Sequence, residues 1–84
     1  MNKVLVKIYW PAFEECYELK IPVEKKIYSI ILMFFKGINE LHNHIEYNPE
    51  NVPILYNKVT AKRYKLNARV EETDIGNGTE LILI

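Results

Sequence analysis

The residues of this sequence that are best suited to metal binding or catalysis are two histidines in one short stretch. His42 and His44 stand in ELHNHIE, between Glu40 and Glu46. Imidazole and carboxylate groups are suitable ligands for a metal ion such as zinc. At a helix end, however, alternate side chains diverge, and histidines there more often complement the negative end of the helix dipole. We therefore expect no metal site, and metal binding by His42 and His44 stays an open alternative.

A nucleophilic or acid–base site is not indicated either. Cys16 has no histidine near it in sequence that could act as its base, so we expect a small apolar side chain at the start of a strand. Glu14 and Glu15 are adjacent, so their carboxylates point apart, whereas acid–base catalysis needs two groups that converge on one substrate. The sequence thus predicts no catalytic residue, no cofactor and a protein that is not an enzyme.

Composition excludes several classes of partner. The 84 residues include 11 basic and 11 acidic side chains, with no long block of either sign, so the footprint of a nucleic-acid-binding protein is missing. The single cysteine excludes an intramolecular disulfide and favours a reduced, cytoplasmic location. No signal peptide is indicated. The most apolar segment, IYSIILMFF, is far shorter than the roughly 20 residues that span a bilayer, so we expect no membrane insertion.

Hydrophobic periodicity predicts an α+β fold in one domain, residues 1–84. Alternation indicates strands, and a spacing of three and four residues indicates a helix. The stretch 59–66 could form another strand or an irregular edge, and Gly76 and Gly78 are expected to supply positive φ angles in a turn. The predicted elements are strands at 3–9, 17–21, 52–56 and 81–84, a helix at 24–42 and a helical turn within 68–74.

The last strand predicts how these elements are arranged. Residues 81–84 are almost continuously apolar, which is typical of a central strand that pairs in parallel with a neighbour. We therefore expect 81–84 beside 3–9 in the middle of a mixed sheet of four to five strands. The main helix is then packed across one face of that sheet.

Four stretches of the sequence carry a resemblance to a known family: KVLVK at 3–7, YELKIP at 17–22, PILYNK at 53–58 and VEETDIGNGTELIL at 70–83. In this order of elements the sequence resembles the ubiquitin-like β-grasp family over nearly its whole length. One departure is that the tyrosine common near Thr73 in that family is missing. The resemblance implies a ubiquitin-like β-grasp fold and a role in binding other proteins.

The end of the sequence refines this resemblance. Conjugated ubiquitins and sulfur carriers end in a mobile Gly-Gly tail, whereas this sequence ends at Ile84 in a predicted strand. The closest resemblance is therefore to the small tail-less bacterial proteins of the YukD/EsaB kind, which accompany type VII secretion systems. It implies a non-enzymatic interaction module, an accessory of a type VII-like system with a protein partner. A modifier or sulfur carrier activated at its C-terminus is the disfavoured alternative.

Two apolar surfaces are candidates for binding. If Val4, Val6, Leu81 and Leu83 face the helix, the residues that alternate with them point to the opposite face of the sheet, where they would form an apolar patch. On the helix, apolar side chains extend beyond the core face and could form the interface of a homodimer. The alternative is that Ile45, Tyr47 and Val52 of the following loop cover them. The predicted interaction residues are Leu5, Leu55, Ile82 and Ile84 on the sheet, and Tyr28, Leu32 and Phe35 on the helix.

Overall fold

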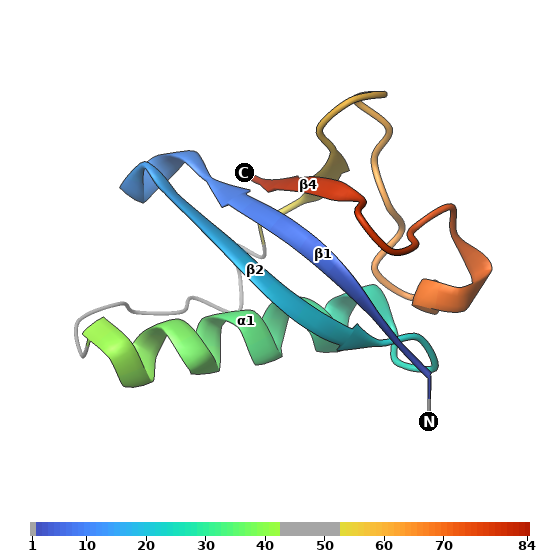
Figure 1. Ribbon diagram of the computed structural model, residues 1–84, viewed down its shortest axis with the longest axis horizontal. Coiled ribbons are helices and arrows are strands. Elements are labelled where there is room, and N and C mark those ends of the chain that lie inside the picture. The colour runs from blue at the N-terminus through green and yellow to red at the C-terminus, as the bar shows by residue number, and fades with distance from the viewer. Residues whose placement is uncertain (1, 43–52) are drawn as a thin grey trace.

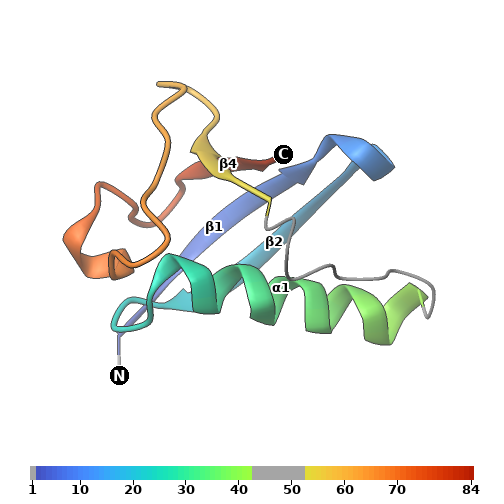
Figure 2. The same cartoon turned by 180° about the vertical axis from the view of Figure 1, so that it is seen from behind.

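The computed structural model describes residues 2–42 and 53–84, with the side chains of 39–42 left out. The elements are β1 (Lys3–Trp10), the 3-10 helix η1 (Pro11–Phe13), β2 (Glu15–Pro22), α1 (Ile27–His42), β3 (Leu55–Asn57), the 3-10 helix η2 (Val70–Glu72) and β4 (Glu80–Leu83). The strands form one mixed sheet in the order β2-β1-β4-β3, in which β1 and β4 are parallel and the other pairs are antiparallel. The helix α1 lies along one face of this sheet (Figure 1 and Figure 2).

The predicted position of the last strand is confirmed. β4 lies between β1 and β3, with Lys7 opposite Glu80 on one side and Leu55 opposite Leu83 on the other. Beyond β4, Ile84 exchanges two backbone hydrogen bonds with Ile54, at 2.8 and 3.0 Å. Residues 80–82 therefore pair with β1 on one side, and residues 81–84 are bonded to β3 and Ile54 on the other.

The β1–β2 hairpin is regular along its whole length. Its register runs from Lys3 opposite Pro22 to Trp10 opposite Glu15. Pro11 ends the first strand because it cannot donate a ladder hydrogen bond, and η1 turns the chain. Glu14 then closes the turn with a left-handed backbone, φ 51°, and its N–H donates to the Pro11 carbonyl. Eight residues on each strand are thereby paired without a bulge.

The helix begins three residues later than the predicted start at Glu24. The backbone of the preceding turn is already bonded elsewhere, since the Val23 carbonyl accepts from Glu71 and the Lys25 carbonyl accepts from Val70. The first N–H groups of α1 are also satisfied from outside the helix. Ile27 donates to the Ala68 carbonyl at 2.8 Å and Tyr28 donates to Leu66 at 3.0 Å. This backbone capping replaces the side-chain cap that the sequence lacks.

The core fills the space between α1 and the sheet. Its largest members alternate along the strands and follow the three-and-four spacing along the helix, as the periodicity predicts. Several aromatic rings close one end, where Trp10 meets Phe34 and Phe35 edge to face. The buried apolar residues are Val6, Ile8, Trp10, Ile21, Ile27, Ile30, Ile31, Phe34, Ile38, Leu55, Tyr64, Val70, Ile75, Leu81 and Leu83.

The chain between β3 and β4 is mostly irregular. The stretch 59–66 forms no strand, only a single bridge between Arg63 and Tyr56, so the irregular edge is the correct alternative. The predicted helical turn within 68–74 is confirmed as η2. Of the two glycines in this turn, Gly78 has the expected positive φ, 85°, but Gly76 does not, so the expectation for Gly76 is wrong. Among the described residues, no helix has the length and apolar character needed to cross a membrane.

Candidate protein-interaction surface

The face of the sheet that points away from α1 carries side chains in ordered rows. Along β1, Val6 and Ile8 are buried against the helix, whereas Lys7 and Tyr9 alternate with them on the opposite side. The strand registers then place Ile82 of β4 beside Tyr9, and Tyr56 of β3 beside Ile82. Three neighbouring strands therefore contribute one continuous row of aromatic and branched side chains.

Ile84 extends this row. It lies two positions beyond Ile82 and is 68% exposed. Tyr9, Tyr56 and Ile82 are each half-buried, so their side chains support one another and still reach the surface. We call these four residues, Tyr9, Tyr56, Ile82 and Ile84, the outer patch. Apolar groups gathered on adjacent strands, with no second layer described over them, are the usual sign of a protein-binding surface.

The structure corrects the predicted membership of this surface at Leu55. Its side chain is 1% exposed and faces the helix, because Leu55 pairs directly with the buried Leu83. Directly opposed residues in an antiparallel pair share a face. The outward orientation expected for Leu55 is therefore wrong, and its neighbour Tyr56 occupies the outer face instead.

Leu5 lies on the outer face but stands apart from the patch. It is 37% exposed and faces Lys20 across the hairpin. A charged pair, Lys7 opposite Glu80, lies between Leu5 and the Tyr9–Ile82 pair. Four residues along a strand cover about 13 Å, so Leu5 does not touch the patch. The sheet surface is thus divided by a row of charges.

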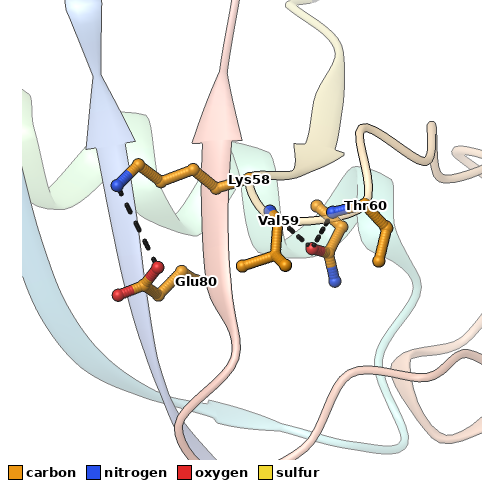
Figure 3. Close-up of polar contacts among 5 residues, drawn as sticks. Lys58, Val59, Thr60 and Glu80 are labelled. Carbon is orange, nitrogen blue, oxygen red and sulfur yellow. Dashed lines mark hydrogen bonds and ion pairs between the residues drawn. The ribbon is translucent and has the colours of Figure 1, made fainter.

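Lys58 and Glu80 form the charged margin of the outer patch. Figure 3 shows Lys58 extending across β4 toward the Glu80 carboxylate, with Nζ and Oε2 4.0 Å apart. The same Nζ lies 4.1 Å from the centre of the Tyr9 ring. Both charges are partly exposed, so the ion pair contributes little, and the cation–π contact adds about 0.5–1 kcal/mol. Lys58 therefore orients the Tyr9 ring at the edge of the patch.

The turn that follows β3 fixes this lysine. The Asn57 side-chain oxygen accepts hydrogen bonds from the N–H groups of Val59 and Thr60, at 2.9 and 3.0 Å (Figure 3). Ala61 completes the turn with φ 61° and donates to the Asn57 carbonyl. An asparagine that hydrogen-bonds the backbone ahead of it is a common way to hold a tight turn. The turn places Lys58 over the sheet and leaves Val59 79% exposed.

Tyr64 is a structural residue that the sequence interpretation overlooked. Its side chain is 3% exposed, and its hydroxyl donates to Asp74 Oδ1 at 2.6 Å and accepts from Asn57 Nδ2 at 3.1 Å. Burial, followed by the hydrogen bond to Asp74, raises the pKa of the Tyr64 hydroxyl to about 12. Tyr64 thus ties together the end of β3, the irregular segment and the loop before β4. A lone aromatic among Lys62, Arg63 and Lys65 was the available signal.

The predicted helix flank is less open than expected. Phe35 packs edge to face on Trp10, with ring centroids 5.4 Å apart, and belongs to the margin of the core. Leu32 is half-buried, and Tyr28 is 37% exposed. The residues expected to cover this flank, Ile45, Tyr47 and Val52, lie outside the described residues. Among Tyr28, Leu32 and Phe35, only Tyr28 belongs to the exposed residues of the described chain.

The remaining chemical candidates do not form a site in the described part of the chain. His44 and the side chain of His42 lie outside it, so metal binding by this pair stays a prediction without a test. In residues 2–42 and 53–84, no three side chains of the histidine, cysteine, aspartate and glutamate kinds gather as a metal site. Cys16 lies at the start of β2, as expected, but it is exposed and stands opposite Tyr9 in the hairpin.

Comparison with solved structures identifies the architecture. No protein-family model matches this sequence, and no curated protein matches it. The ubiquitin-like domain of the Mycobacterium tuberculosis type VII secretion system protein EccD1 superposes with a TM-score of 0.72 at 14% identity, over 100% of this chain and 99% of that one. This protein has the ubiquitin-like β-grasp fold. The predicted fold class is thereby confirmed.

Two further structures show the range of this fold. The EccD5 ubiquitin-like domain from Mycobacterium xenopi gives a TM-score of 0.74 at 13% identity, covering 100% of this chain and 94% of that one. Ubiquitin of Caldiarchaeum subterraneum gives 0.68 at 13% identity, covering 98% and 91%. Such low identities establish a shared fold and no shared role. The secretion-system domains and the ubiquitin are therefore similar to this protein in architecture alone.

Proposed function

We propose that this ubiquitin-like protein is a non-enzymatic interaction module that binds a protein partner through the outer patch. The single observation that carries the proposal is the row formed by Tyr9, Ile82 and Tyr56 on three adjacent strands, extended by the exposed Ile84. The row is apolar, contiguous and bordered by charges. That combination of an apolar centre and a charged rim is typical of protein interfaces.

The proposed setting is a bacterial type VII-like secretion system, in which this protein is a cytoplasmic accessory of the YukD/EsaB kind. Support comes from two ubiquitin-like domains of EccD proteins, one of which is named as part of a type VII system, with TM-scores of 0.72 and 0.74. A chain of an ESX-5 inner membrane complex also matches, at 10% identity and a TM-score of 0.72 over 21% of its length. The proposed partner is a protein component of such an assembly.

A carrier activated at its C-terminus stays the alternative function. Activation of a carboxylate requires a segment that can leave its own domain and enter the active site of an enzyme. β4 is not such a segment, because residues 80–82 pair with β1, residues 81–83 pair with β3, and Ile84 exchanges two backbone hydrogen bonds with Ile54.

A graded series of substitutions tests the outer patch. Ile82→Glu places a charge at its centre and is expected to weaken partner binding by at least about tenfold, because central interface residues carry most of the binding energy. Leu5→Glu, beyond the charged row, is expected to weaken binding less. The measurement is titration calorimetry with secretion-system proteins encoded near this gene, supported by circular dichroism of each variant.

Val59→Glu is the matched control. Val59 is also a branched apolar residue and is 79% exposed, but it lies on the turn outside the outer patch. It should leave the affinity unchanged. If Ile82→Glu remains folded and binds as tightly as Val59→Glu, the outer patch is not the docking surface.

A further inference from the structure

The border of the sheet formed by β2 has an open backbone edge. β2 pairs with β1 on one side, and no described residue pairs with its other side. The strand is eight residues long and paired without a bulge, and its only proline, Pro22, is its last residue. A long, regular edge of this kind is a template for a further strand.

The hydrogen-bond pattern identifies the groups that point outward from this edge. The Val23 N–H donates to the Asn2 carbonyl, so Ile21, Leu19 and the other residues of the same parity bond to β1. The remaining positions of β2, Cys16, Glu18 and Lys20, therefore direct their N–H and C=O groups away from the sheet. An added strand would bond to the backbone of these three residues.

The order of charges on β2 favours a second copy of the same strand. In a symmetric antiparallel pair, a two-fold axis at Glu18 would place that residue opposite its own copy, and an axis at Lys20 would oppose two lysines. An axis at Leu19 places Glu18 of each copy opposite Lys20 of the other, at both facing positions. Opposite charges directly across two strands stabilise the pair, and like charges destabilise it.

The apolar side of the strand fits the same axis. Between β2 and α1 lies a groove of about 190 Å³ that includes Tyr17, Leu19 and Met33 in its lining. The groove is mostly apolar, and Met33 in its lining is 51% exposed, so apolar surface there is in contact with water. With the axis at Leu19, Leu19 of the second copy lies directly opposite its counterpart and next to this groove. Association would then remove apolar surface from water on one face while pairing charges on the other.

We propose that two copies of this protein associate through antiparallel pairing of their β2 strands, with the two-fold axis at Leu19. Each Glu18–Lys20 pair exchanges two backbone hydrogen bonds as well as its charge contact. The two sheets become one continuous sheet of eight strands. The outer patch is not used in this contact, so the dimer would present two copies of it to a partner.

Charge reversal tests the contact and its register together. Glu18→Lys and Lys20→Glu each place like charges opposite one another, so each is expected to raise the dimer dissociation constant by at least about tenfold. The double variant Glu18→Lys/Lys20→Glu restores opposite charges and should associate as the natural protein does. An equimolar mixture of the two single variants should form a heterodimer. Sedimentation velocity over a range of concentrations measures all four cases.

Lys62→Glu is the matched control for Lys20→Glu. Lys62 is an exposed lysine on the segment outside β3, so its reversal changes the net charge equally and should leave association unchanged. A natural protein that stays monomeric at all concentrations overturns the proposal. So does association that the single reversals leave intact. Loss of association in Ile82→Glu, but not in Glu18→Lys, would assign self-association to the outer patch instead.

Disulfide trapping gives a second, independent measurement. The Leu19 positions would form a non-hydrogen-bonded pair with Cα atoms about 4.5 Å apart, within the range that a disulfide spans. In a Cys16→Ser background, Leu19→Cys is expected to crosslink rapidly under mild oxidation. Val59→Cys in the same background is the exposed control and should crosslink slowly. Equal crosslinking rates for the two variants would contradict an axis at Leu19.

Discussion

At the β3 border the sheet ends in three residues, Leu55–Asn57, which the segment after them covers, whereas the β2 border runs for eight residues with no described cover. At β3, Asn57 donates to the Lys62 carbonyl and Tyr64 donates to the Leu55 carbonyl. At β2, the proposed pairing depends on the order of Glu18, Leu19 and Lys20 along the strand. The difference shows that one sheet can have an edge covered by the following segment of the chain and another edge where the side chains determine which strand can pair with it.

The largest expected effect comes from removing the cover of the β3 border. Tyr64→Ala deletes a side chain that is 3% exposed and hydrogen-bonded to Asp74 and Asn57. The loss of a buried aromatic ring typically costs about 3–5 kcal/mol of unfolding free energy. Urea unfolding measures this loss of free energy. Tyr28→Ala is the control, and its effect should be small because Tyr28 is 37% exposed. A loss below that of Tyr28→Ala would show that the cover contributes little.

A smaller effect is expected from the hydroxyl of Tyr64 alone. Its folded-state pKa is raised to about 12 from the ordinary tyrosine value of 10.0, so the folded protein retains this proton more strongly than the unfolded chain. The resulting stability is fully present below the unfolded pKa and is lost as pH rises through the folded pKa. The unfolding free energy should therefore fall between about pH 10 and about pH 12.

Tyr64→Phe isolates this contribution. The variant lacks the titrating group, so its unfolding free energy should fall less over the same pH interval, and subtraction removes the effect of other groups such as lysines. At neutral pH we expect a loss of about 1–2 kcal/mol, because Asp74 loses a hydrogen-bond donor. Parallel pH dependences in the two proteins would mean that the Tyr64 proton is not linked to folding.

The smallest perturbation needs no substitution and concerns the β2 border. In dilute protein, the amide protons of Glu18 and Lys20 should exchange at least about tenfold faster than those of Leu19 and Ile21, since only the latter pair bonds to β1. Raising the protein concentration should slow exchange at Glu18 and Lys20. Amide exchange followed by NMR measures both effects. Equal protection of all four amides in dilute protein would show that the border is already covered.

The sequence predicted the fold well because its main signals are local and repeated. Alternation in residues 3–9 and the helical spacing from Ile27 to Ile38 each recur several times, so single exceptions do not obscure them. The apolar run 81–84 indicated a central strand, and the register of β4 confirms it. The predicted helix start was wrong because the Val70 and Glu71 N–H groups bond to the carbonyls of Lys25 and Val23 in the turn before it, which no local pattern reveals.

The binding surface was harder to predict because it depends on register between strands. Ile54, Leu55 and Tyr56 are consecutive apolar residues, so alternation alone does not say which of them faces the core. The pairing of Leu55 with Leu83 decides it. The separation of Leu5 from Ile82 likewise follows from Lys7 lying opposite Glu80. Tyr64 was missed because its partners, Asn57 and Asp74, are reached only through the fold.

The parallel pairing of β1 and β4 also affects how the chain is made. Leu5 and Asn77, 72 residues apart, are joined by a hydrogen bond, and the two strands form the centre of the sheet. During translation the hairpin and the helix emerge from the ribosome long before the strand that completes their core. The nascent chain must therefore keep an unfinished hydrophobic face exposed until its last strand is released, which makes this interval a time when chaperones can bind it.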